Sequence, residues 1–201
     1  MASKTSICNM ALSHLGIAKP IANIDSEQSQ EAAACRTFYD VSRDRVSRDV
    51  AWPFLTKIEA LALVEEDPNE EWAFSYRYPS DCLDVRKIQS GVRNETNSQR
   101  VPYKIASDDQ GLLLFTDRED AILEYTARVD NVNLYPADFM VALSYRLATY
   151  IAARLTSGDP FKLMDSVMGL YRIEISNAAA NAQNEEQPDV YPDSEFVQAR
   201  L

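Results

Sequence analysis

The chain has 201 residues, 46% hydrophobic and 25% charged, a composition typical of a folded globular protein and not of a disordered one. Its formal net charge of −11 disfavours tight binding to a nucleic-acid backbone over a broad face. The sequence lacks an apolar run of about 18 residues and a signal-peptide pattern. We therefore expect no membrane span and a protein made and kept in a cytosol.

Two helices are predicted in the first quarter of the chain. The first spans Ser3–Leu15, where apolar residues recur at helical spacing, and Gly16 has the position of a C-cap residue. The second spans Glu27–Val50, and either Asp25 or Ser26 is expected to be its N-cap. Pro53 ends this helix, because proline disfavours helical geometry in the residue before it.

One face of the second helix is rich in charge. Opposite charges lie four residues apart, close enough to pair: Arg36 with Asp40, Asp44 with Arg48, and Arg45 with Asp49. The simplest interpretation is a solvated face, and contact with a neighbouring subunit is the alternative. The aromatic residues Trp52 and Phe54 directly after the helix are expected to pack in the core between the helices and the segment that follows.

The middle of the chain, residues 57–129, is predicted to be a β-rich insert. Residues 57–64 are apolar and fit either a strand or a short helix, and residues 65–71 are predicted to form an acidic loop. Strong β-formers then alternate with smaller or charged residues. The further strands form a predicted meander over residues 72–78, 83–88, 101–105, 111–115 and 121–126.

Two more helices are predicted after the insert. Pro136 has the position of a first helical turn, and an apolar face follows it as far as Leu155. Asp159 and Pro160 have the residue types of an N-cap and a first helical position. So short a break predicts that these helices pack antiparallel.

The predicted fold class is therefore α+β: a bundle of about four helices with an inserted antiparallel β-sheet region. Residues 1–56 and 130–184 form the bundle, residues 57–129 the insert, and residues 185–201 an extended acidic tail. The tail's apolar residues, Val190, Tyr191 and Phe196, are candidate partner-binding residues, because they are too few to order the tail by themselves.

The sequence offers no recognisable catalytic, cofactor-binding or metal-binding set. Its one histidine, His14, lies beside an apolar helical stripe and is interpreted as structural. The three cysteines, Cys8, Cys35 and Cys82, are widely spaced and are expected to be reduced thiols. No phosphate-cradling glycine motif is present. A pair of carboxylates that catalyses glycosidase-like hydrolysis remains an alternative. The adjacent pairs are Glu65 and Glu66, Asp108 and Asp109, and Glu119 and Asp120.

A series of short motifs occurs in a characteristic order between about residue 7 and residue 155. The runs are Ala11-Leu12-Ser13-His14-Leu15-Gly16, Ile24-Asp25-Ser26, Glu31-Ala32, Cys35, Phe38-Tyr39-Asp40, Arg43, Trp52-Pro53-Phe54, the stretch from Trp72 to Leu83, and Glu124-Tyr125-Thr126. Each is common alone, but their order and spacing resemble the tail tubular protein A family, the head-to-tail adaptor (gatekeeper-ring) proteins of tailed phages.

The resemblance implies a non-enzymatic virion protein without cofactors, made in the bacterial host cytoplasm. It implies a helical bundle with a β insert, in a ring of twelve copies through which DNA passes. The implied partners are other copies of the chain, the portal protein, which such adaptors grip through a terminal extension, and the next tail (nozzle) protein. Two alternatives stay open: a carboxylate-dependent polysaccharide hydrolase, and a virion or cytosolic scaffold that forms no ring.

Overall fold

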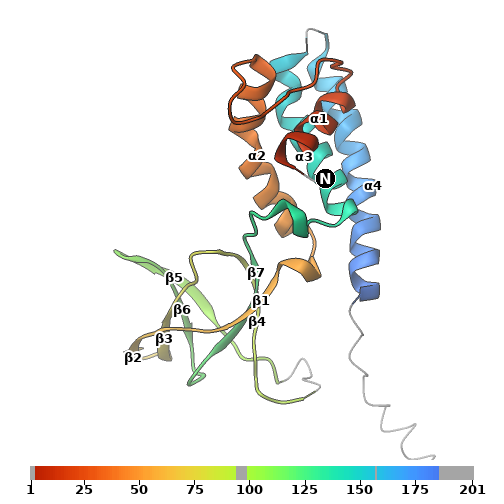
Figure 1. The fold of residues 1–201 in the computed structure, drawn as a ribbon. Helices are drawn as coiled ribbons and strands as arrows, with labels where there is room; N and C mark the ends of the chain where they lie inside the picture. Colours follow the sequence, from red (N-terminus) through yellow and green to blue (C-terminus); the bar gives the residue numbers. More distant parts are fainter. Residues whose placement is uncertain (1–2, 94–98, 157, 186–201) are drawn as a thin grey trace, which may run out of the picture.

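The computed structural model describes residues 3–93, 99–156 and 158–185. The fold is mixed α+β, with an elongated bundle of helices and two small antiparallel sheets beside one end of it (Figure 1). This confirms the predicted fold class. The helices are α1 (Lys4–His14), α2 (Gln30–Asp49), α3 (Ala137–Leu155) and α4 (Pro160–Glu185), with the short 3-10 helices η1 (Pro53–Leu55) and η3 (Val132–Leu134).

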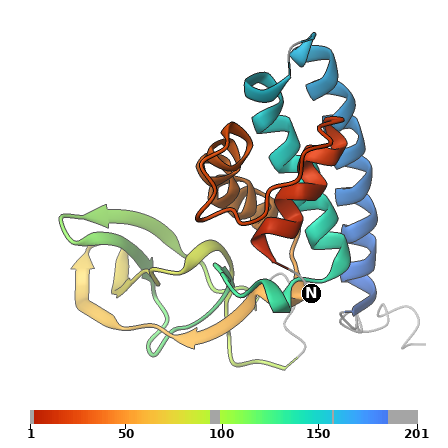
Figure 2. The ribbon, with the colours of Figure 1, turned by 45° about the horizontal axis from the view of Figure 1, so that its top comes forward.

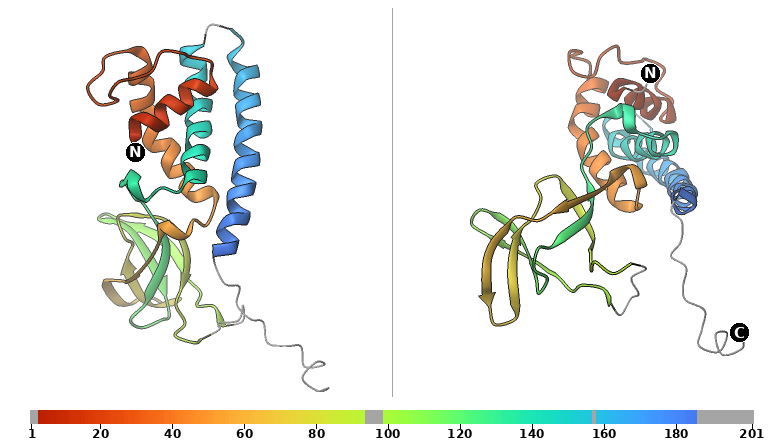
Figure 3. Two further views of the ribbon diagram at one scale, coloured as in Figure 1. Left: turned by 45° about the vertical axis from the view of Figure 1, so that its right-hand side comes forward. Right: turned by 60° about the horizontal axis from the view of Figure 1, so that its bottom comes forward.

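Helix α3 is the centre of the bundle, and it packs against α1, α2 and α4. Residues on several faces of it are fully buried, among them Phe139 on one side and Ser144 and Ala148 on the opposite side. Helix α4 runs antiparallel to α3 along its length, as the short connection between them predicts (Figure 3).

Local capping signals fix several helix ends. Ser3 caps α1 and forms a reciprocal capping box with Ser6. The Asp159 carboxylate accepts hydrogen bonds from the N–H groups of Phe161 and Lys162, both at 3.2 Å, so the predicted N-cap of the last helix is confirmed.

The start of α2 was predicted wrongly. The helix begins at Gln30 and its N-cap is Ser29, whose hydroxyl accepts a hydrogen bond from Ala32. The preceding residues form a turn, in which the Asn23 side chain accepts hydrogen bonds from the N–H groups of Asp25 and Ser26. The Arg36 guanidinium also donates to the backbone carbonyls of Ile24 and Glu27. These long-range bonds hold the segment away from the helix axis.

The strands form two sheets and not the predicted meander. The first sheet has the order β1-β7-β4 and the second the order β2-β3-β6-β5, and all pairs are antiparallel. The chain therefore passes repeatedly from one sheet to the other (Figure 2). The strands are β1 (Thr56–Ala60), β2 (Leu63–Asn69), β3 (Trp72–Arg77), β4 (Cys82–Ile88), β5 (Lys104–Asp108), β6 (Gly111–Thr116) and β7 (Ile122–Ala127).

Two strands differ from their predicted positions. Most of the predicted acidic loop belongs to β2, an edge strand whose exposed carboxylates stay in water while its backbone pairs with β3. The strand predicted over residues 101–105 begins instead at Lys104 and continues to Asp108, because its register is set by pairing with β6. In both cases backbone pairing overrides the local polarity of the side chains.

The two sheets enclose a second hydrophobic core, separate from that of the bundle. It contains Tyr76, Ile88, Leu114, Ala121, Leu123, Tyr125 and Ala127. The bundle core reaches the sheets through Trp52, which is only 2% exposed and whose indole N–H donates to the Val46 carbonyl at 2.9 Å. The Arg86 guanidinium on β4 donates to the Trp52 carbonyl, also at 2.9 Å. The predicted core position of Trp52 is confirmed.

Candidate functional site

The three adjacent acidic pairs considered from the sequence lie at the surface. All six side chains are exposed: Glu65 and Glu66 on β2, Asp108 and Asp109 at the β5–β6 turn, and Glu119 and Asp120 before β7. Asp108 is bound by both terminal nitrogens of Arg77 at 2.9 and 3.0 Å, and these hydrogen bonds lower its pKa. All three pairs therefore lie in open surface positions.

The structure instead brings together two carboxylates that are far apart in the sequence. The hydroxyl of Tyr125 on β7 lies 3.0 Å from a carboxylate oxygen of Glu59 on β1 and 2.9 Å from one of Asp81, which precedes β4. The Lys57 ammonium lies 2.8 Å from Glu59 and 3.0 Å from Asp81. The group borders an open hollow of about 780 Å³ between the two sheets. Sequence spacing gave no signal for it.

The electrostatics of this cluster keep both carboxylates ionised. Hydrogen bonds from Lys57 and Tyr125 lower the pKa of Glu59. Partial burial opposes ionisation of Asp81, but bonds from the same two residues outweigh it and its pKa is also lowered. A glycosidase needs one carboxylic acid with a raised pKa beside an ionised partner. The Glu59 and Asp81 pair does not supply that acid, and its geometry is that of an ionic cross-link between β1, β7 and the start of β4.

The ionic cross-link makes a pH-dependent prediction. Because Lys57 lowers the pKa of Glu59 and Asp81 in the folded state, its stabilising effect is complete above their ordinary values near pH ~4 and is lost as the pH falls through the lowered values. The melting temperature of Lys57→Met should therefore differ most from wild type near neutral pH, and the difference should shrink towards pH ~2.

Thermal melts from pH ~7 to pH ~2 test this prediction. Lys104→Met is the matched control, since Lys104 pairs with one exposed carboxylate, that of Glu71 at 3.1 Å, whereas Lys57 binds two. A single exposed pair should change stability little at any pH. A constant difference between Lys57→Met and wild type across the pH range would contradict the assignment.

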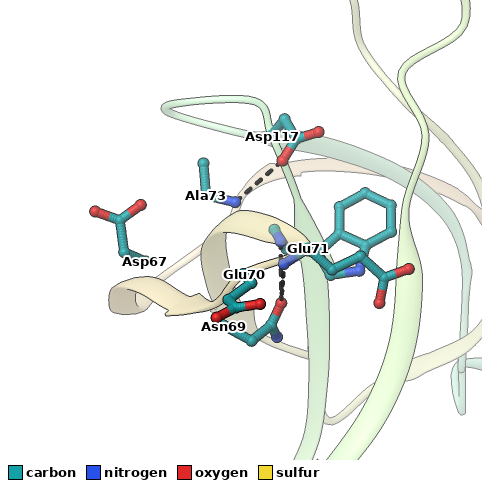
Figure 4. Close-up of a pocket in the computed structure, with 7 residues that line it drawn as sticks. Asp67, Asn69, Glu70, Glu71, Ala73 and Asp117 are labelled. Atoms are coloured by element: carbon teal, nitrogen blue, oxygen red, sulfur yellow. Dashed lines mark hydrogen bonds between the residues drawn. The ribbon is translucent and has the colours of Figure 1, made fainter.

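A second acidic region surrounds the β2–β3 turn, in an open hollow of about 600 Å³ (Figure 4). The Asn69 side chain accepts hydrogen bonds from the N–H groups of Glu71 and Trp72, and Asp117 accepts one from Ala73 at 3.0 Å. Figure 4 shows Asp67 and Asp117 on either side of Ala73, well apart. Within the described residues no group of three or more His, Cys, Asp or Glu side chains could hold a metal ion. The Asn69 side chain and the Asp117 carboxylate therefore hold the turn.

His14 is held between helices as a structural side chain. Its ring stacks on Tyr145 with centroids 4.0 Å apart, and Nε2 lies 2.9 Å from the Ser144 hydroxyl. That hydroxyl donates to the Val141 carbonyl, so it accepts from a protonated Nε2 of neutral His14. Partial burial lowers the pKa of His14, which also favours the neutral form. The structural interpretation agrees with these contacts. The cysteines are free thiols, Cys8 and Cys35 buried and Cys82 partly so.

A buried arginine joins the bundle to the insert; it is one of the motif residues named from the sequence, where no structural role was assigned to it. The Arg43 side chain on α2 is only 6% exposed and binds Asp44 at 2.9 Å and Asp40 at 3.1 Å. It also pairs with Asp130, and Arg128 binds Asp44 at 2.7 Å. Both partners lie in the segment between β7 and η3. This network, which we call the Arg43 junction, ties α2 to the end of the insert.

Two of the three charge pairs predicted within α2 do not form, because their members bind other groups. Only the pair of Arg45 with Asp49, at 3.1 Å, forms as expected. Arg36 binds backbone carbonyls, and Asp44 binds Arg43 and Arg128. Arg48 lies 3.9 Å from Asp84 on β4. Part of the face predicted to be solvated therefore contacts the insert.

The candidate partner-binding residues Val190, Tyr191 and Phe196 lie outside the described residues. In the part of the chain that the structure describes, no helix combines the length and hydropathy needed to cross a membrane. Comparison with known proteins adds no relative: no protein-family model matches the chain, and no curated protein matches it.

Proposed function

We propose that this chain is a structural virion protein, a head-to-tail adaptor that forms a ring between portal and tail through which DNA passes. The observation that carries the proposal is the order of its elements. Two helices, a β insert of two small sheets and two further helices follow one another in the described residues. The resemblance to the tail tubular protein A family implies a helical bundle with a β insert, and the motifs that carry it lie between α1 and β7.

The chemistry of the best candidate site favours an adaptor over a hydrolase. Among the described residues, Glu59 and Asp81 are the only two carboxylates that contact the same tyrosine and the same lysine. The pKa of each is lowered. Hydrolysis of a polysaccharide would need one of them protonated near neutral pH. A hydrolase would lose activity in Glu59→Gln or Asp81→Asn with its fold intact, and we expect no activity to be present.

The charge of the chain suits a protein that lets DNA pass without holding it. The net charge is −11, and many cations are already paired with carboxylates. The paired cations are Arg43, Arg45, Arg48, Lys57, Arg77, Lys87, Lys104 and Arg128. Acidic residues outnumber lysine and arginine by 31 to 20, so the chain as a whole repels phosphates, and affinity for DNA grows with the number of phosphates that a protein neutralises.

We therefore expect duplex DNA to bind more weakly than about 1 µM at a salt concentration of about 0.15 M. Fluorescence anisotropy with a labelled duplex, repeated at lower salt, measures this. Submicromolar affinity that falls steeply with added salt would contradict the prediction and would make nucleic-acid binding the better proposal.

The ring is tested by the mass of the protein alone and after mixing with the portal protein. One copy has a mass of 22.7 kDa. An adaptor should give a particle of many copies on the portal, because a ring repeats one heterologous contact until it closes. A non-ring scaffold would give single copies or small, open assemblies, and a stand-alone hydrolase would not bind the portal.

A further inference from the structure

A small apolar pocket lies at the C-terminal end of α4, where this helix passes η1 and the start of α3 (Figure 1). Its walls include the aromatic residues Trp52, Phe54 and Tyr135, two prolines, and the alanines Ala178 and Ala182 of α4. The pocket has a volume of about 180 Å³, whereas most small-molecule sites have roughly 300–1,000 Å³. It therefore suits one large apolar side chain better than a cofactor. We call it the α4 end pocket.

The hydrogen bonds around the α4 end pocket favour an occupant without polar atoms. The indole N–H of Trp52 already donates to the Val46 carbonyl at 2.9 Å, and the Tyr135 hydroxyl donates to the Val129 carbonyl at 2.6 Å. Both side-chain donors of the aromatic walls are therefore used. A tyrosine that entered the pocket would need a partner for its hydroxyl, whereas a phenylalanine needs none.

The chain beyond the described residues starts at the rim of this pocket. Glu185, the last residue of α4, lines the pocket, and residues 186–201 follow it. This segment contains one phenylalanine, Phe196. The stretch from Glu185 to Phe196 can span about 36 Å when extended, whereas the pocket covers two turns of α4, about 11 Å. A tethered side chain has an effective concentration on the order of 1 mM, so the segment of the same chain outcompetes that of another copy at micromolar concentration.

The charges of the rim select the same part of the segment. Asp138 and Glu185 are the charged residues among those that line the pocket, and both are acidic. They disfavour the stretch around Tyr191, which has an aspartate two residues away on either side. Phe196 has one acid beside it and Arg200 four residues later, so its surroundings are neutral overall.

We propose that Phe196 of the same chain occupies the α4 end pocket and holds the C-terminal segment against the bundle. The acidic stretch 186–195 then forms a loop that starts and ends at the pocket. Val190 and Tyr191 lie within this loop and stay available to a partner, whereas Phe196 is an internal anchor. The inference does not rest on the proposed adaptor function, because the pocket, its charges and the sequence that follows α4 carry it.

Cleavage by chymotrypsin tests the proposal, because this protease cuts after large aromatic residues. The bond after Phe196 is a substrate, whereas Pro192 blocks cleavage after Tyr191. A docked segment is cut only when it opens, so the rate follows the fraction of open chains. Mass spectrometry should show that the full chain is cut after Phe196 at least about tenfold more slowly than a synthetic peptide of residues 186–201.

Leu134→Glu tests the pocket itself. Leu134 lines the pocket but is 56% exposed, so the substitution adds a third carboxylate at the rim without opening the core. Cleavage should then come within about threefold of the rate for the free peptide. The matched control is Leu63→Glu on β2, at a side chain that is 49% exposed in the insert, and it should stay as protected as wild type.

Arg200→Glu is a second variant that leaves the described fold untouched. It places an acid near the acidic rim and should speed cleavage severalfold, relative to a peptide with the same change. Circular dichroism confirms that all variants stay folded. Equal rates for wild type and the free peptide, or full protection in Leu134→Glu, would overturn the inference. Protection that is lost on about tenfold dilution would place Phe196 in the pocket of another copy and would also overturn it. Each of these results leaves the adaptor proposal standing.

Discussion

Replacing Trp52 with alanine should destabilise the protein by about 3–5 kcal/mol. The indole is 2% exposed, and its ring meets Phe139 edge-on with centroids 5.0 Å apart and Phe54 at 6.1 Å. Its N–H also satisfies the Val46 carbonyl at the end of α2. The substitution therefore leaves a cavity in the bundle core, removes aromatic contacts and unpairs a buried carbonyl.

Urea unfolding followed by far-ultraviolet circular dichroism measures this loss without relying on tryptophan fluorescence. The control is Trp72→Ala at the other tryptophan of the chain, which is partly exposed at the start of β3 and whose indole N–H has no hydrogen-bond partner among the described residues. It should cost less than half as much. An unchanged unfolding midpoint for Trp52→Ala would contradict the role of Trp52 as the core residue beside the insert.

Arg43→Ala should have the second largest effect, about 2–3 kcal/mol. The guanidinium is almost fully buried and makes charge-assisted hydrogen bonds to Asp44, beside it on α2, and to Asp130, beyond β7. Loss of the bond to Asp130 leaves the Arg128–Asp44 ion pair as the remaining link of the Arg43 junction. The estimate stays below that for a fully buried ion pair, because the Asp130 side chain is 69% exposed and can be rehydrated.

Arg45→Ala on the same helix is the matched control for the Arg43 junction. Arg45 pairs with Asp49 at 3.1 Å, but its side chain is 58% exposed, so its removal should cost less than about 1 kcal/mol. Equal midpoints for the two variants in urea would show that burial of Arg43 adds nothing to its charge pairing.

Local signals in the sequence predicted the helical part of the fold well. Asp159 and Pro160 mark the start of α4 because capping acts within one turn, and the apolar spacing in α3 follows directly from its buried position. Trp52 could be placed in the core because a large aromatic side chain beside a proline stop has few alternatives to burial.

The errors lie where distant residues decide the structure. The turn before α2 is held partly by a local signal, the Asn23 side chain, and partly by distant bonds from Arg36 to backbone carbonyls. Strand β2 forms because β3 pairs with its backbone, although several of its side chains are acidic. The division into two sheets follows from pairing of β1 with β7, more than 60 residues away. For the same reason neither the Glu59 and Asp81 cluster nor the Arg43 junction could be found from spacing.

The central claim, that this chain forms a ring on a portal, is tested most directly by electron microscopy of the wild-type protein mixed with the portal protein. End-on views should show a closed ring of repeated subunits around an open channel. Images of the portal alone, or of single copies bound at irregular positions, would contradict the account.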